Sequence, residues 1–222
     1  MGGDGEQYCQ AYLVRSPISL FILCTSCLNR IRDAALTCVI KIQRAVDSPY
    51  GISPLPQLLS DRDEQSTLQV LELGTGCGVV GIALAQTIPR CSVHVTDLEE
   101  AREIVGRNVD SATLAPGSTV KFEVLDWDEA LSREVSSRQH DLIVVSDCTY
   151  NADSMPALVR TLRALSDCSP GCPAMIALKR RHESEEVFFG LMEEAGFKKE
   201  EQGQKNSKRS REGNVEIYFF RG

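Results

Sequence analysis

Glycines and carboxylates lie close together in the middle of the chain, in an order that suits the binding of a small ligand. Gly74, Gly76 and Gly78 directly follow an apolar run, and Asp97 closes the next apolar stretch. Glycines let the backbone approach a ligand with no Cβ in the way. A carboxylate such as that of Asp97 can accept hydrogen bonds from two ribose hydroxyls. The pattern therefore favours a nucleotide-like ligand.

The surrounding residues predict the elements that would hold these groups. Residues 68–73 are apolar enough for a buried parallel strand, residues 79–88 have the length and apolar face of a helix, and residues 93–95 form a second strand. This order is a βαβ unit of a doubly wound sheet. Such a sheet binds its ligand at the carboxyl ends of the strands.

The acidic residue Glu72 discriminates between possible nucleotides. The spacing of Gly76, Gly78 and Gly81, with Asp97 further on, formally matches a dinucleotide fingerprint. However, Glu72 places a carboxylate at the end of an apolar strand, where it would repel a pyrophosphate and where burial is costly unless it is paired. An ammonium group would pair with it. S-adenosylmethionine carries an ammonium and a sulfonium but no phosphate, and is therefore the predicted cofactor; the alternative is that Glu72 simply reaches solvent.

The rest of the chain continues the alternation of strands and helices. The sequence predicts a Rossmann-like α/β fold with a doubly wound, mostly parallel seven-stranded sheet and a terminal antiparallel strand. We expect residues 31–222 to form this domain and residues 1–30 to be a separate segment of unclear role. The further predicted strands are 120–125, 141–146 and 174–178 and the terminal pair 197–201 and 215–220, and the further helices are 31–46, 99–112, 154–166 and 183–195.

Three further residues at predicted strand ends carry candidate chemistry. Trp127 follows the third strand and can stack on adenine, unless it is a core or rim aromatic. Asp147 and Tyr150 follow the fourth strand, where a carboxylate and a phenol can hold an amine in line for attack on a methyl group. The alternatives are a helix cap for Asp147 and a packing role for Tyr150.

Composition limits the class of protein and its partners. The chain has 222 residues, 42% of them hydrophobic, and a net charge of −7, so nucleic-acid binding is not expected. Its nine cysteines are typical of reduced thiols in the cytoplasm or nucleus, and no metal site is expected. The apolar run 17–28 is too short to span a bilayer, so no membrane association is expected either. We expect a monomer.

Four ordered motifs resemble methyltransferase family 16, the seven-β-strand protein-lysine methyltransferases that modify translation factors and chaperones. The motifs are ELGTG at residues 72–76, TDLEE at 96–100, LDW at 125–127 and DCTY at 147–150. The resemblance covers roughly residues 31–220, and its most specific part is the Asp-x-x-Tyr after the fourth strand. It implies S-adenosylmethionine as cofactor and a protein lysine as methyl acceptor.

The resemblance also assigns roles to individual residues. Those that would contact the cofactor are Gly74, Thr75 and Gly76 around the methionine part, Asp97 at the ribose, Trp127 at the adenine and Ser146 at its flank. Glu72 joins them through its expected pairing with the ammonium group. Asp147 and Tyr150 would face the target lysine as catalytic residues. There is one departure from the family pattern: Arg32 stands where the family has a cofactor-contacting tryptophan.

Three alternatives remain open at this stage. A small-molecule methyltransferase would share every cofactor motif, although the Asp-x-x-Tyr motif argues against it. A catalytically weakened cofactor-binding homologue would be consistent with Arg32 and the unusual N-terminus. An oxidoreductase using a nicotinamide dinucleotide would leave Glu72 unexplained.

Overall fold

The computed structural model describes most of the chain. The described residues are 11–15, 20–24, 33–47, 54–63, 65–149, 151–179, 184–200 and 215–222. Arg32 and Tyr150 lie outside them, so the predicted roles of these two residues stay predictions.

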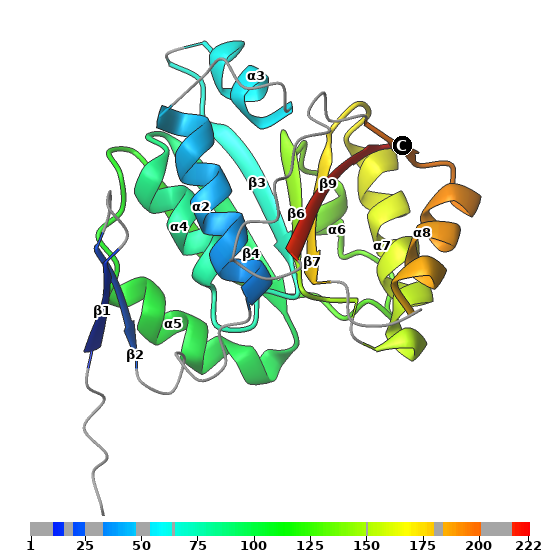
Figure 1. Cartoon of the computed structure of the whole chain (residues 1–222), viewed down its shortest axis with the longest axis horizontal. Coiled ribbons are helices and arrows are strands. Elements are labelled where there is room, and N and C mark those ends of the chain that lie inside the picture. Colours follow the sequence, from blue (N-terminus) through cyan, green and yellow to red (C-terminus); the bar gives the residue numbers. More distant parts are fainter. Residues whose placement is uncertain are drawn as a thin grey trace, which may run out of the picture.

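A seven-stranded sheet forms the centre of the molecule (Figure 1). Its strand order is β5-β4-β3-β6-β7-β9-β8; the first five of these run parallel, and β9 is antiparallel to both of its neighbours. The strands are β3 (Leu68–Leu73), β4 (Cys91–Asp97), β5 (Thr119–Val124), β6 (Leu142–Ser146), β7 (Ala174–Lys179), β8 (Lys198–Lys199) and β9 (Val215–Arg221).

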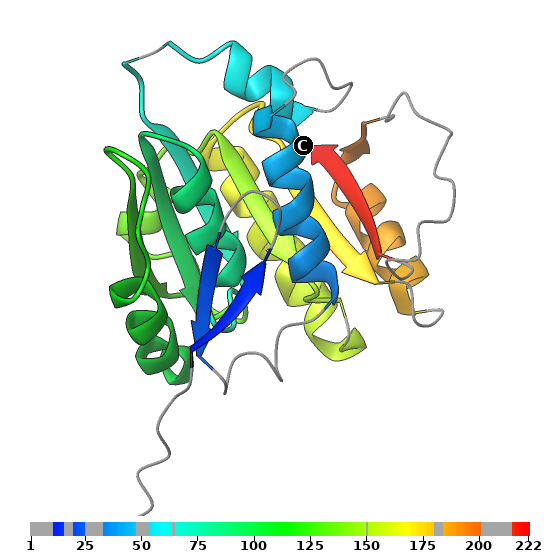
Figure 2. The ribbon, with the colours of Figure 1, turned by 60° about the vertical axis from the view of Figure 1, so that its left-hand side comes forward.

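Helices cover both faces of this sheet (Figures 1 and 2). On one face lie α2 (Asp33–Asp47), α3 (Pro54–Ser60), α4 (Val79–Thr87) and α5 (Arg102–Asp110), the last preceded by the 3₁₀ turn η1 (Glu99–Ala101). On the other lie α6 (Arg133–Ser136), α7 (Met155–Cys168) and α8 (Ser184–Glu194), with the 3₁₀ turn η2 (Ala152–Ser154) before α7.

Two hydrophobic cores follow from this layering, one on each face of the sheet. Alternate residues of β3 show the division: Val70 packs in the core beneath α2 and α4, whereas Leu71 and Leu73 pack in the core beneath α7 and α8. Because both faces of the central strands are covered, β3 and β6 are almost continuously apolar. Glu72 is the one acidic residue on β3, and it is 1% exposed.

The predicted fold class is confirmed, with differences at the ends of elements. Each predicted strand and helix from residue 31 onward is present, and the predicted strand 93–95 extends over all of β4. Three features were not predicted from the sequence: α3, α6 and an antiparallel hairpin of β1 (Ala11–Arg15) and β2 (Leu20–Cys24). The apolar run 17–28 overlaps β2. None of the helices among the described residues is long and apolar enough to cross a membrane.

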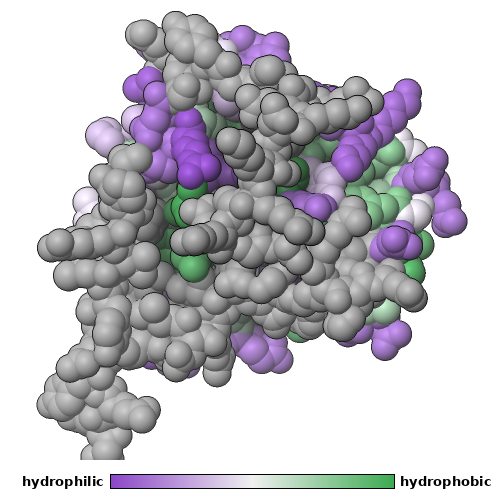
Figure 3. Space-filling model, in the orientation of Figure 1, coloured by the Kyte–Doolittle hydropathy of each residue, from purple (hydrophilic) through white to green (hydrophobic). Residues whose placement is uncertain are grey.

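The surface in the view of Figure 3 mixes hydrophilic and hydrophobic side chains. Four large hydrophobic side chains stand out among the described residues because they are more than a third exposed: Leu36, Leu98, Val124 and Val187. Isolated exposed apolar residues are normal on protein surfaces. Leu98 is different, because it also lines the cavity described next.

Candidate functional site

A cavity of about 460 Å³ opens at the carboxyl ends of the parallel strands. It lies where the chain order reverses, because β3 is paired with β4 on one side and with β6 on the other. Ligands of doubly wound proteins bind at such a switch point. The lining residues are Ala35, Glu72, Gly74, Thr75, Gly76, Cys77, Val79, Val80, Asp97, Leu98, Leu125, Asp126, Trp127, Asp128, Ser146, Asp147, Cys148, Asn151, Ser154 and Ala157.

The turn after β3 requires its glycines for two different reasons. Gly74 and Gly76 both have left-handed backbones, with φ of 62° and 60°. A Cβ on Gly74 would lie 2.6 Å from Cys148 Sγ and 3.0 Å from Trp127 Cζ2, so this glycine is needed for packing. A Cβ on Gly76 would meet no heavy atom within 4 Å. Since Gly76 lines the cavity, its missing side chain leaves room for a ligand.

Alanine substitutions at these two glycines should have different effects, one mainly on the stability of the fold and the other mainly on cofactor binding. Gly74→Ala should lower the free energy of unfolding by more than 2 kcal/mol, because about 1 kcal/mol of left-handed strain adds to the overlap with Cys148 Sγ. Gly76→Ala should cost only the strain, yet weaken cofactor binding at least tenfold. Urea unfolding and fluorescence titration measure the two effects.

A second substitution serves as the control for this pair. Adding Cys148→Ala to Gly74→Ala removes the overlapping sulfur and should restore part of the lost stability. If the two single variants behaved alike in both assays, the distinction between the packing glycine and the ligand-facing glycine would be wrong.

Glu72 anchors the same turn from inside the protein. Its Oε2 accepts hydrogen bonds from Thr75 Oγ1 at 2.7 Å and from the backbone N–H of Gly81 at 2.9 Å. Gly81 is essential to this contact, since a Cβ there would lie 2.3 Å from Val95 Cγ1 and 2.7 Å from Glu72 Oε2. Burial raises the pKa of Glu72 to about 7, although the hydrogen bonds from Thr75 and Gly81 act in the opposite direction. One carboxylate oxygen is thus used to tie β3 to the start of α4.

This raised pKa predicts a pH-dependent contribution to stability. An acid whose pKa rises from about 4.5 to about 7 on folding stabilises the fold when protonated, and that stabilisation is lost as the pH rises through 7. Relative to Glu72→Gln, the wild type should therefore lose about 2–3 kcal/mol of unfolding free energy between pH 5 and pH 8. Urea unfolding of both proteins across this range measures the difference. A difference that does not change with pH would show that Glu72 titrates normally.

Asp97 and Trp127 both line the cavity. Asp97 ends β4, and its carboxylate accepts backbone hydrogen bonds from Gly76 N at 2.7 Å and from Leu98 N at 2.8 Å. These bonds fix the orientation of the carboxylate while each oxygen keeps further acceptor capacity. Trp127 and the exposed side chain of Leu98 add apolar surface to the lining. An apolar and aromatic lining next to an oriented acceptor suits an adenosine group.

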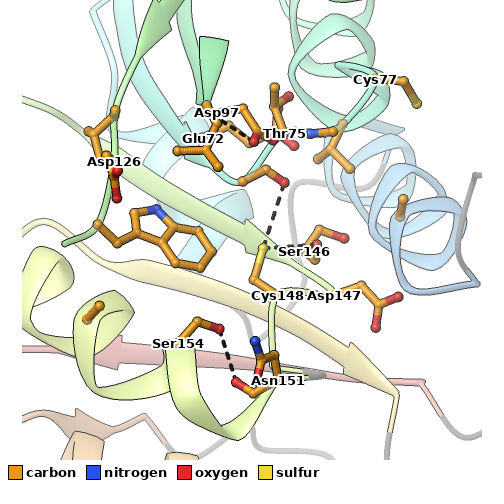
Figure 4. Close-up of a pocket in the computed structure, with 18 of the residues that line it drawn as sticks. Glu72, Thr75, Cys77, Asp97, Asp126, Ser146, Asp147, Cys148, Asn151 and Ser154 are labelled. Atoms are coloured by element: carbon orange, nitrogen blue, oxygen red, sulfur yellow. Dashed lines mark hydrogen bonds between the residues drawn. The ribbon is translucent and has the colours of Figure 1, made fainter. Parts of the chain in front are cut away.

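The end of β6 supplies the opposite wall of the cavity. The hydroxyl oxygen of Ser146 is buried and has no hydrogen-bond partner among the described residues. Asp147 follows it with a left-handed backbone, φ 57°, and is 7% exposed; its N–H donates to Ala177 O at 2.8 Å. The next side chain, Cys148, points its Sγ at the carbonyl oxygens of Leu73, Gly74 and Ser146, at 3.4–3.7 Å. This loop is therefore held against the glycine turn (Figure 4).

The structure brings almost all predicted site residues together. Glu72, Gly74, Thr75, Gly76, Asp97, Trp127, Ser146 and Asp147 all line the one cavity, whereas Tyr150 lies outside the described residues. Their roles as ligand-binding or catalytic groups stay predictions. Sequence reasoning missed the contribution of Asn151, Ser154 and Ala157, which line the cavity from the loop and the first turns after β6. It also did not foresee that Asn151, rather than Asp147, caps the helical turn here.

The lining of the cavity is strongly acidic. It contains the carboxyl groups of Glu72, Asp97, Asp126, Asp128 and Asp147, and among the described lining residues there is no lysine, arginine or histidine. One of these carboxyl groups has a basic neighbour among the described residues, because Arg160 Nη2 lies 3.5 Å from Asp128 Oδ1. Like charges repel, so the cavity disfavours phosphates and favours a cationic ligand.

The fold and the position of the cavity define the class of protein. The carbon methyltransferase CurJ is structurally similar, with a TM-score of 0.54 at 13% identity, over 73% of this chain and 50% of that one. The fold is that of the Rossmann-like methyltransferases. Residues 23–195 match methyltransferase family 16, described as lysine methyltransferase, and the chain belongs to this family.

Two curated relatives illustrate the similarity. The UPF0665 family protein C23C4.06c of Schizosaccharomyces pombe is 38% identical over 122 residues, covering 55% of this chain and 36% of that protein. EEF1A lysine methyltransferase 3 of Mus musculus is 33% identical over 154 residues, covering 69% of this chain and 61% of that protein. The chain thus spans less than two thirds of the length of either relative.

Proposed function

We propose that this chain is an S-adenosylmethionine-dependent methyltransferase whose acceptor is a lysine of a protein. The observation that carries the proposal is the acidic cavity without a basic side chain among its described lining residues. Both reactants of such an enzyme are cations, because the cofactor has a sulfonium and an ammonium group and the acceptor is an ammonium before it loses a proton. Family membership supports the same activity.

The residues present fit the cofactor. Ser146, Gly76 and Asp97 all line the cavity. The hydroxyl of Ser146 is buried and has no partner among the described residues, Gly76 leaves open space, and the carboxylate of Asp97 is held in one orientation. In this proposal the turn of Gly74, Thr75 and Gly76 borders the methionine part, and Gly76 is the glycine that faces it. Asp97 holds the ribose hydroxyls and Trp127 the adenine. When bound, S-adenosylmethionine supplies an electrophilic methyl group. The protein supplies binding and orientation.

Asp147 is the residue proposed to receive the target lysine. Its buried carboxyl group can hold an ammonium by charge and hydrogen bond. The left-handed backbone of Asp147 sets the direction in which this side chain leaves the chain. The lysine must be neutral to accept a methyl group. The carboxylate of Asp147 raises the pKa of the bound lysine, whereas removal of the amine from water lowers it. In this proposal the loss of hydration dominates, and the proton leaves to solvent before methyl transfer. Tyr150 is proposed to assist at the same position.

The names of relatives support a protein acceptor of the translation machinery. One is named for lysine methylation of EEF1A in Mus musculus, and another, from Saccharomyces cerevisiae, is a protein-lysine N-methyltransferase, EFM6. We therefore propose a translation factor as the acceptor, and the motif resemblance to the family adds a chaperone as the alternative. We further propose that the protein is a monomer, that it acts in the cytoplasm or nucleus, and that it binds neither nucleic acid nor membranes.

Labelling with radioactive cofactor tests the proposal directly. The purified protein is incubated with tritiated S-adenosylmethionine and an undialysed whole-cell lysate, and labelled products are separated into proteins and small molecules. We expect a labelled protein band whose label is recovered as methyl-lysine after hydrolysis. Label found only in small molecules would favour a small-molecule methyltransferase. No label, despite binding of the cofactor in a fluorescence titration of the single tryptophan, Trp127, would indicate a catalytically weakened homologue.

A further inference from the structure

Asn151 lies at the cavity wall across from Glu72 and Asp97. It is four positions after Asp147, in the connection between β6 and α7. Figure 4 shows Asn151 and Ser154 on one side of the cavity, with Glu72 and Asp97 on the other. Because Asn151 shares this connection with Asp147, the residue proposed to receive the lysine, we place Asn151 on the acceptor side of the site.

Local hydrogen bonds hold Asn151 in one orientation. Its side-chain Oδ1 accepts a hydrogen bond from the backbone N–H of Asp153 at 3.1 Å, which caps η2. Its backbone carbonyl accepts from Ser154 Oγ at 3.0 Å. With Oδ1 turned back to the chain, the amide nitrogen Nδ2 is the part of the side chain left for a ligand. Within the described part of the chain, Nδ2 has no protein partner.

Asn151 differs in chemistry from the other polar groups of the cavity. It is the one side-chain amide among the described lining residues, and five of the others are carboxyl groups, which attract cations. A protein segment that presents a lysine also presents main-chain carbonyl oxygens. These need donors, and an ionised carboxylate cannot provide one.

We infer that Asn151 Nδ2 donates a hydrogen bond to a main-chain carbonyl of the protein segment that carries the target lysine. The inference rests on the proposed function. Such a bond would fix the segment relative to Asp147 without selecting for neighbouring side chains. Asn151 is thus a positioning residue for the acceptor and makes no contact with the cofactor.

Two substitutions separate this role from the cap. Asn151→Asp and Asn151→Ser both keep a side-chain oxygen that can cap η2, but neither provides an amide donor at the position of Nδ2. The serine variant adds no charge to the acidic cavity. Asp153→Asn is the matched control, because the exposed Asp153 takes part in the cap through its backbone N–H alone and does not line the cavity.

The acceptor for this measurement is the lysate protein that the wild type labels most strongly, after purification. Its concentration is varied while tritiated S-adenosylmethionine is kept at a saturating concentration. We expect both Asn151 variants to raise KM for this protein about tenfold, because the loss of one hydrogen bond has about this effect on affinity. Cofactor affinity and Tm should be unchanged. The Asp153→Asn control should match the wild type in all three measurements.

Specific outcomes would overturn the inference. An unchanged KM in both Asn151 variants would show that the amide does not contact the acceptor. A parallel loss of cofactor affinity would place the contact on the cofactor instead. If the wild type labelled no protein at all, the proposed function would fail and the inference with it, so the two failures can be told apart.

Discussion

Replacing Asp147 by asparagine should lower turnover about 100-fold or more while leaving the affinity for S-adenosylmethionine unchanged. The size of the effect is that of losing one preorganised electrostatic contact to a reacting group. Asparagine has nearly the same shape and tolerates the left-handed backbone (φ 57°) as aspartate does, so the fold should be kept. Single-turnover labelling measures the rate, and fluorescence of Trp127 measures the affinity.

Asp147→Gly is the control for backbone strain. Glycine adopts a left-handed backbone without cost, so this variant removes the carboxyl group and the strain together. If charge is what matters, Asp147→Gly should lose as much turnover as Asp147→Asn. Wild-type turnover in the asparagine variant would leave the acceptor side of the cavity without its proposed anchor, and a parallel loss of cofactor affinity would move Asp147 to the cofactor side.

The central part of the fold is predictable because its signals are local. The mostly apolar run 68–73 is followed directly by Gly74, and residues 79–85 of the next helix are apolar and buried. The limits of strands are less predictable. The predicted strand 93–95 lies within β4, which extends as far as its pairing with β3 and β5 allows. Polar residues enter this strand because they find partners: His94 Nδ1 lies 2.9 Å from Glu123 Oε1 on β5.

The candidate site was predictable where it depends on strand ends alone. The carboxyl ends of parallel strands meet at one edge of the sheet, which is why Asp97, Trp127 and Asp147 come together. Asn151 and Ala157 also line the cavity, but their position depends on the path of a loop that no residue pattern reveals.

The environment of Glu72 was only half predictable. A buried acid needs partners, and the sequence suggested a ligand ammonium. In the structure, Oε2 is bonded to Thr75 and Gly81 within the protein. The spacing of Gly81 in the fingerprint was the available signal, because the third glycine of such a motif allows close approach of helix and strand.

Replacing Asp97 by alanine should weaken the binding of S-adenosylmethionine by roughly 2–4 kcal/mol. A carboxylate that accepts bonds from two ribose hydroxyls contributes through two charge-assisted hydrogen bonds, each worth about 1.5–3 kcal/mol before coupling. The dissociation constant should therefore rise about 30- to 1,000-fold. Fluorescence titration of Trp127, with calorimetry as a second method, measures the change.

The structure shows why this variant needs a second comparison. Asp97 also accepts hydrogen bonds from the backbone N–H groups of Gly76 and Leu98, so alanine loosens the turn as well as removing the ribose contact. A double-mutant cycle separates the two effects. Wild type and Asp97→Ala are each titrated with S-adenosylhomocysteine and with its 2′-deoxy analogue. If Asp97 contacts the ribose, removal of the 2′-hydroxyl should weaken binding to the wild type about tenfold or more and should hardly affect the variant. An equal loss in both proteins would mean that Asp97 acts on affinity only through the turn that it holds.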